Sequence, residues 1–179
     1  MKFMPVPIGG AFIVALEPVG DERGFFARSF CQEEFRQQGI DPLVAQCNIS
    51  FNRHRGTLRG LHYQVKPHEE AKLVRCTQGA IWDVIVDLRE NSPTQYRWFA
   101  TELTAENHWA LYIPGGLAHG FQTLSDHSEV FYQMSEFYHP ESARGVRWDD
   151  PVIGITWPVG NPVLSLRDKS YPLLERGAS

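Results

Sequence analysis

Glycine and proline interrupt this chain so often that long helices have little room to form. The sequence holds 15 glycines and 12 prolines in 179 residues, and between them lie short segments rich in β-branched and aromatic residues. Such segments are typical of strands, and we expect them at 11–17, 25–29, 73–77, 80–88, 96–103, 110–113, 120–123, 129–135 and 145–148. One short helix is expected at 31–39, where good helix formers precede Gly39. The pattern favours an all-β jelly roll or barrel over a doubly wound α/β fold.

The segment 80–88 is the most informative of these strands. Its even-numbered residues are all apolar, whereas the odd-numbered Ile81, Asp83, Ile85 and Asp87 alternate apolar with acidic. Because alternate residues of a strand face opposite sides, one face is wholly apolar and the other is mixed. This arrangement predicts a two-sheet sandwich with a cavity on the mixed side.

Composition excludes several classes of function. Lys and Arg total 17 against 21 Asp and Glu, and the net charge of −4 argues against binding to nucleic acid or an anionic membrane. The scattered Cys31, Cys47 and Cys76 are expected to be free thiols in a reducing compartment. Two prolines interrupt the N-terminal segment, and the longest apolar run is too short to cross a bilayer. We expect a cytoplasmic protein with a single domain over residues 1–179.

Two histidines end the half-motifs of a cupin. The pattern G-x5-H ends at His62 and the pattern P-x-G-x2-H ends at His119. Cupins often bind a divalent metal through three His and one Glu, but the residue two after His62 is Gln64, and the first Glu beyond it is Glu69. The sequence therefore predicts a cupin scaffold without a metal.

Strand alternation through 58–64 predicts that Leu58, Gly60, His62 and Gln64 share one face. A histidine of this kind is more often a hydrogen-bonded structural residue. Inside a polar cavity it is instead a base whose ordinary pKa lies near working pH.

Taken together, the motifs resemble one family, the dTDP-4-dehydrorhamnose 3,5-epimerases, which are metal-free cupins of nucleotide-sugar metabolism. The resemblance covers nearly the whole chain and rests on D-E-R-G-F-F (21–26), L-R-G-L-H-Y-Q (58–64), K-L-V-R-C (72–76), D-V-I-V-D-L-R (83–89), P-G-G-L-A-H-G-F (114–121), two tyrosines (132 and 138) and L-S-L-R-D (164–168). It implies a cupin-type jelly roll with one or two short helices. It also implies a reaction without cofactor or metal, and a homodimer that exchanges N-terminal strands.

The family's reaction explains the catalytic residue types. The protons on C3 and C5 of a 4-keto sugar are weakly acidic because each carbon is adjacent to the ketone, so epimerisation needs a base, a donor at the enolate oxygen and an acid on the opposite face. Similarity to the family implies that His62 is the base and that Asp168 pairs with its imidazole, as a triad aspartate does. Lys72 would face the C4 oxygen, and Tyr132 would return the proton.

Other matches imply contacts with the rest of the substrate. The diphosphate or sugar would be held by Arg23, Gln46, Asn48, Arg59 and His119, and the base would stack on Tyr138 and Phe26. Asp83 would orient His62 or Arg59, or serve a structural role.

Four positions depart from the family pattern. Arg28 stands where members commonly carry Glu, Cys47 replaces Asp, Ala143 replaces Glu, and Arg167 replaces Lys. These departures leave open which nucleotide base is bound, with Arg28 a further phosphate or base contact. They also leave open whether C3, C5 or both are inverted. The alternatives are a mono-epimerase for a CDP- or GDP-linked sugar, a metal-dependent cupin enzyme and a non-catalytic sugar-nucleotide binding module.

Overall fold

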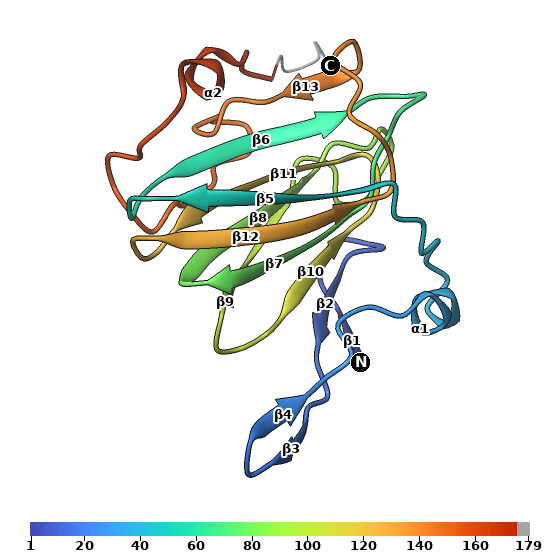
Figure 1. Cartoon of the computed structure of the whole chain (residues 1–179). Helices are drawn as coiled ribbons and strands as arrows, with labels where there is room; N and C mark the ends of the chain where they lie inside the picture. Colours follow the sequence, from blue (N-terminus) through green and yellow to red (C-terminus); the bar gives the residue numbers. More distant parts are fainter. Residues whose placement is uncertain (175–179) are drawn as a thin grey trace.

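Two antiparallel sheets face each other in the computed structural model, which describes residues 1–174 (Figure 1). In spatial order, the first sheet comprises β1 (Lys2–Pro5), β2 (Phe12–Ala15), β10 (Ala110–Ile113), β7 (Lys72–Gln78), β12 (Ser128–Met134) and β5 (Gln46–Asn52). The second comprises β13 (Ala143–Gly145), β6 (Leu58–Gln64), β11 (Leu117–Thr123), β8 (Ala80–Asp87) and β9 (Trp98–Thr104). The remaining elements are the hairpin β3 (Val19–Asp21) and β4 (Gly24–Phe26), and the helices α1 (Gln32–Gln37) and α2 (Leu166–Ser170). The all-β sandwich expected from the sequence is confirmed.

Most of the expected strands begin and end within three residues of an observed strand. Strands β1 and β5 were not expected, nor was the pairing of β3 with β4 as a hairpin. The expected strand 25–29 ends at Phe26 and belongs to the hairpin. Strand β5 was missed because its pattern is inverted: its polar residues Gln46, Asn48 and Ser50 are half-buried, whereas Ile49 and Phe51 are exposed. Such a strand is expected where a sheet lines a polar cavity rather than an apolar core.

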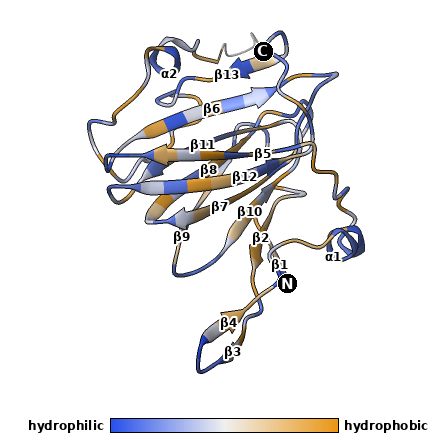
Figure 2. Ribbon diagram, viewed as in Figure 1, coloured by the Kyte–Doolittle hydropathy of each residue, from blue (hydrophilic) through white to orange (hydrophobic). Residues whose placement is uncertain are grey.

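Apolar packing holds the two sheets together at one end. Ile81 and Ile85 of β8 pack against Val74 and Val130 of the opposite sheet, so the mixed face of β8 points inward as expected. On the outside, a second cluster joins Val86 to Ile153 of the C-terminal tail. A third packs α1 against the first sheet. Apolar side chains thus pack both between the sheets and on their outer faces. Figure 2 shows apolar and polar residues distributed along the strands.

A register shift between β6 and β11 turns two site residues in the same direction. His62 pairs with His119 and Arg59 pairs with Phe121, so two residues of β6 lie opposite the single Gly120. A Cβ atom on Gly60 would lie 2.6 Å from the Cα atom of Gly120, which leaves no room for a side chain there. The predicted alternation through 58–64 is therefore wrong across the shift: Arg59 and His62 both reach the cavity.

The tail after Trp157 returns to the second sheet. The backbone of Val163 exchanges hydrogen bonds with Gly56 and Leu58 at the start of β6. The short α2 follows, and the Ser165 hydroxyl accepts the backbone N–H of Asp168, a typical N-cap. Neither α2 nor any other helix in residues 1–174 has the length and apolar character needed to cross a membrane.

Candidate active site

A cavity of about 750 Å³ opens between the two sheets, away from the apolar core. Its size is that of a small-molecule site. Among its lining residues are the following predicted site residues: Gln46, Asn48, Arg59, His62, Lys72, His119, Tyr132, Tyr138 and Arg167. They come from β5, β6, β7, β11 and β12, from the loop after β12 and from helix α2, so the fold brings together residues that lie far apart in the sequence.

The imidazole of His62 is held by a carboxylate from the tail. Nε2 of His62 lies 2.7 Å from Oδ1 of Asp168, whose side chain is buried. Burial alone raises the pKa of Asp168, but the hydrogen bonds from His62 and Ser165 and the positive charge of Arg167 outweigh it and hold that pKa below its ordinary value. The carboxylate accepts the hydrogen of Nε2, which leaves the lone pair of Nδ1 free to take a proton.

Lys72 is buried, although lysines at strand starts are usually solvated. Its ammonium lies 2.8 Å from Oε1 of Glu70 and donates to the backbone carbonyl of His62 at 3.3 Å. Glu70 was not expected at the site. Its second oxygen, Oε2, is buried and makes no hydrogen bond to any described residue. Lys72 thus lies at the cavity wall next to the backbone of His62, as one half of a buried ion pair.

Tyr132 lines the cavity from the first sheet, whereas His62 belongs to the second. Burial raises the pKa of the Tyr132 hydroxyl; Glu70 acts in the same direction and Arg59 opposes it. The hydroxyl therefore keeps its proton at neutral pH. An imidazole and a protonated hydroxyl thus line the cavity from different sheets.

The second cupin histidine has its own carboxylate. Nε2 of His119 lies 2.7 Å from Oδ1 of Asp83, which is fully buried. The expectation that Asp83 orients His62 or Arg59 is wrong, because Asp83 and His119 come from neighbouring strands β8 and β11 and meet directly. The Arg59 Nε donates instead to Oδ1 of Asn52 at 2.7 Å.

Gln64, at the third position of the cupin ligand set, holds two loops in place. Its amide nitrogen donates to the carbonyls of His68 and Phe137, each at 3.0 Å, and its amide oxygen accepts the backbone N–H of His139 at 2.6 Å. These bonds commit the side chain of Gln64 to holding the two loops together.

The part of the cavity wall formed by β5 carries the amide side chains of Gln46 and Asn48. The amide nitrogens of Gln46 and Asn48 contact the Met134 sulfur at 3.4 and 3.3 Å. A thioether is a weak acceptor, so both amides are readily available to a ligand oxygen.

Where the tail meets the cavity, a guanidinium lies beside two aromatic rings. The Arg167 guanidinium lies 5.7 Å from the centre of the Tyr171 ring, and that ring meets His62 edge-on at 5.7 Å. Tyr138, which is 52% exposed, stands at the cavity mouth. A flat ring with an exposed face beside a guanidinium suits a nucleotide base next to phosphate.

Three predicted binding residues lie away from this cavity. Arg23 sits in the turn of the β3–β4 hairpin, paired with Asp21, and Phe26 on β4 is 77% exposed. Figure 1 shows the hairpin projecting from the two sheets, and Figure 2 shows the apolar colour of β4 on it. Arg28 follows the hairpin and pairs with Glu34 of α1 at 3.1 Å.

The chain matches the model of the dTDP-4-dehydrorhamnose 3,5-epimerase family over residues 5–176. It belongs to this family. A Shigella flexneri dTDP-4-dehydrorhamnose 3,5-epimerase is 46% identical over 169 residues, covering 94% of this chain and 93% of the relative. The fold is similar to that of the Bacillus anthracis dTDP-4-dehydrorhamnose 3,5-epimerase with TDP and PPi bound (TM-score 0.94, 41% identity, 97% and 99% coverage). It is also similar to a Streptomyces bikiniensis 3'-monoepimerase in complex with dTDP-quinovose (TM-score 0.88, 40% identity, 95% and 86% coverage).

The departures from the epimerase pattern fall into two groups in the structure. Cys47 is exposed and is not among the residues that line the cavity, so its change leaves the cavity wall intact. Ala143 and Arg167 do line the cavity. Two of the four altered positions are thus part of the same cavity wall as Tyr138.

Sequence reasoning missed Glu70, Tyr171 and Gly145. A Cβ atom on Gly145 would lie 2.4–2.5 Å from three ring carbons of Tyr171, so this glycine makes the space for the ring beside His62. The Ser-x-x-Asp pattern at Ser165 and Asp168 is a helix-start signal that could have revealed α2, and with it Tyr171 three residues beyond Asp168. No comparable signal identifies Glu70.

Proposed function

We propose that this protein inverts both C3 and C5 of a nucleotide-linked 4-keto-6-deoxyhexose, converting dTDP-4-dehydro-6-deoxy-D-glucose to dTDP-4-dehydro-L-rhamnose, with inversion of one carbon alone as the alternative. The observation that carries the proposal is the carboxylate-held imidazole of His62, 2.7 Å from Asp168, in a cavity that Lys72 and Tyr132 also reach. Membership of an isomerase family that acts on nucleotide sugars supports it.

His62 removes the proton next to the ketone. Its Nδ1 takes the proton while Asp168 holds the hydrogen on Nε2 and stabilises the resulting imidazolium. The low pKa of Asp168 keeps this carboxylate charged at neutral pH. Negative charge then moves to the C4 oxygen as the enolate forms, and the buried ammonium of Lys72 stabilises it there.

Tyr132 returns a proton to the opposite face of the sugar. It comes from the other sheet, and its raised pKa keeps the hydroxyl protonated until the enolate needs it. The two steps replace one C–H hydrogen with another and need no redox partner. His62 then releases its proton to solvent, and Tyr132 regains one from solvent, before the next turnover.

The diphosphate and base hold the substrate in place, because the two epimers differ little in bonding and binding energy must come from the unreactive part. Gln46, Asn48, Arg59 and His119 face the cavity at positions suited to phosphate and sugar oxygens, and Tyr138 with Arg167 suits the base. The TDP-type ligands of the related structures support thymidine as that base.

A second candidate is inversion at C3 only. The similarity to a 3'-monoepimerase, at 40% identity, favours it as the alternative. Both candidates use the same base and acid and differ in whether C5 is also deprotonated.

Incubation with substrate in deuterium oxide tests the proposal. We expect deuterium at C3 and C5 for the full epimerase, or at C3 alone for the mono-epimerase. If neither position takes up label, the proposed function is wrong.

Our proposal includes a cytoplasmic homodimer in which the chain acts as one domain. Three free thiols suit the cytoplasm. Exposed Val19, Phe25 and Phe26 on the projecting hairpin suit burial against a second chain. In such a dimer the hairpin of one chain carries Arg23 and Phe26 to the cavity of the other.

Arg23→Ala is expected to raise KM by about 10–100-fold, the equivalent of losing charge-assisted hydrogen bonds to phosphate. Glu22→Gln, in the same turn, is the matched control and should leave KM unchanged. Mixing Arg23→Ala chains with inactive His62→Ala chains should restore activity, because one cavity of the mixed dimer then has both His62 and Arg23. No recovery after proven subunit exchange would contradict the shared site.

A further inference from the structure

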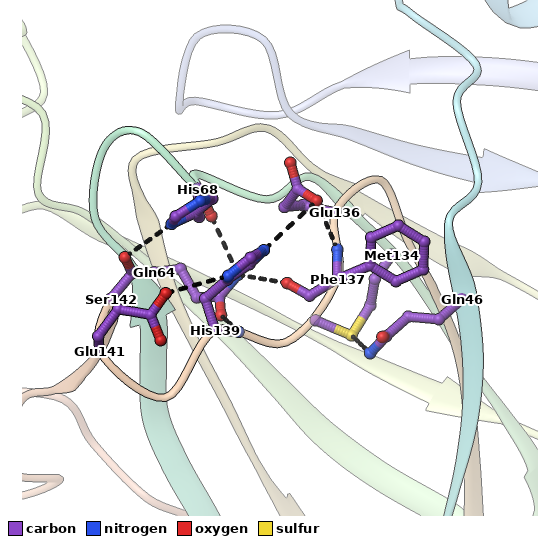
Figure 3. Close-up of polar contacts among 9 residues, drawn as sticks. All are labelled: Gln46, Gln64, His68, Met134, Glu136, Phe137, His139, Glu141 and Ser142. Atoms are coloured by element: carbon purple, nitrogen blue, oxygen red, sulfur yellow. Dashed lines mark hydrogen bonds and ion pairs between the residues drawn. The ribbon is translucent and has the colours of Figure 1, made fainter.

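A second cluster of ionisable side chains lies outside the cavity, where two loops meet (Figure 3). The loop between β6 and β7 provides His68, and the segment after β12 provides His139, Glu136 and Glu141. The two imidazole rings stack, with centroids 3.5 Å apart and planes 8° from parallel. The proposed epimerase reaction uses none of these four residues.

Carboxylates flank His139 on both sides. Its Nδ1 lies 3.1 Å from Oε1 of Glu141, and its Nε2 lies 3.9 Å from Oε1 of Glu136. Nδ1 of His68 lies 2.9 Å from the hydroxyl of Ser142. Figure 3 shows these contacts converging on the histidine pair from the 136–142 segment.

The cluster supplies three metal-ligand atoms. One nitrogen of each ring and one oxygen of Glu141 lie within 4.8 Å of one another. Ligands around a tetrahedral zinc ion, at about 2.0–2.1 Å from the metal, are roughly 3.3 Å apart. Because imidazole lone pairs lie in the ring plane, the stacked rings must tilt to share one ion. His68 and His139 are only half-buried on loops, so such rotations do not disturb a packed core.

We propose that His68, His139 and Glu141 bind a divalent transition-metal ion, with zinc as the ion that fits best. Two imidazoles and one carboxylate form a donor set that suits zinc over magnesium or calcium. This site is separate from the cupin position in the cavity, where His62 and His119 each pair with an aspartate.

The ion joins two loops that shape the cavity. Gln64, which lines the cavity, already ties them through the carbonyls of His68 and Phe137 and the N–H of His139. Tyr138 lies between the last two of these residues. A bound ion therefore fixes the segment that carries Tyr138 and stabilises the folded state in proportion to its occupancy.

Titration calorimetry on untagged, chelator-treated protein tests the proposal, with zinc chloride as the probe. We expect the titration to give one zinc ion per chain. Thermal unfolding should show a rise in Tm with zinc but none with magnesium. His68→Gln and His139→Gln should each weaken zinc binding at least about tenfold, the lower bound for losing even an outer partner of a metal ligand. His54→Gln is the matched control, because His54 is an exposed histidine elsewhere on the chain.

Copper provides a second measurement that does not depend on how the variants fold. The electron paramagnetic resonance spectrum of the parent protein with one equivalent of Cu²⁺ should show coupling to two imidazole nitrogens. Unchanged zinc binding in both His→Gln variants would overturn the proposal. So would loss of zinc binding in His62→Gln with full binding in His139→Gln, which would place the ion in the cavity. No outcome depends on the epimerase reaction, so this proposal fails or stands separately.

Discussion

Lys72→Met is expected to lower kcat by about 10²–10³, the loss measured for removal of one oxyanion donor. In the proposed mechanism this buried ammonium carries the charge that stabilises the enolate oxygen, and the variant lacks that charge. The same change leaves Glu70 buried without its partner, and breaking a buried pair in this way costs about 3–5 kcal/mol of folding free energy. Steady-state kinetics and thermal unfolding measure the two losses separately.

Glu70→Gln separates the two effects. The amide keeps the shape of Glu70 but removes its charge, so the double variant Lys72→Met/Glu70→Gln should recover much of the stability lost in Lys72→Met. It should not recover kcat, because the enolate still lacks its cation. A double variant that regained both would show that Lys72 acts on the fold alone.

His62→Ala is expected to lower kcat/KM by about 10²–10⁴, the contribution of a positioned general base. The variant should also lose deuterium uptake at every carbon that the parent labels. His54→Gln, which changes an exposed histidine away from the cavity, is the control. Label uptake by His62→Ala at the rate of the parent would exclude His62 as the base.

Asp168→Asn tests the pairing on its own. Its amide can donate to Nε2 and so favours the tautomer with the hydrogen on Nδ1, which blocks the nitrogen that takes the proton. The equivalent change in serine proteases lowers kcat by about 10⁴. A loss similar to that of His62→Ala, with substrate binding retained, would confirm that the carboxylate works through the imidazole.

The sandwich could be predicted because strand and turn preferences depend on residues that are close together in the sequence. The mixed face of β8 indicated both the two-sheet packing and the side on which the cavity lies. Strand β5 did not follow the usual rule, because its inward residues are polar and its outward residues Ile49 and Phe51 are apolar. The family resemblance, rather than periodicity, identified Gln46 and Asn48 on this strand.

The site was predicted in part. Resemblance implied that His62 and Asp168 meet, and the structure places them 2.7 Å apart. Periodicity could not foresee the shift at Gly60 and Gly120 that turns Arg59 toward the cavity, because it depends on contact between two strands distant in sequence. Nor could it foresee that Arg23 and Phe26 lie far from the cavity of their own chain, since a hairpin's direction depends on what it packs against.

Because Asp168 follows both sheets in the sequence, it reaches His62 only when the segment after Trp157 has folded back along β6. The same segment brings Leu174 against the outer apolar cluster, so a protease that cut the chain just before α2 would remove the carboxylate and part of this packing in one event.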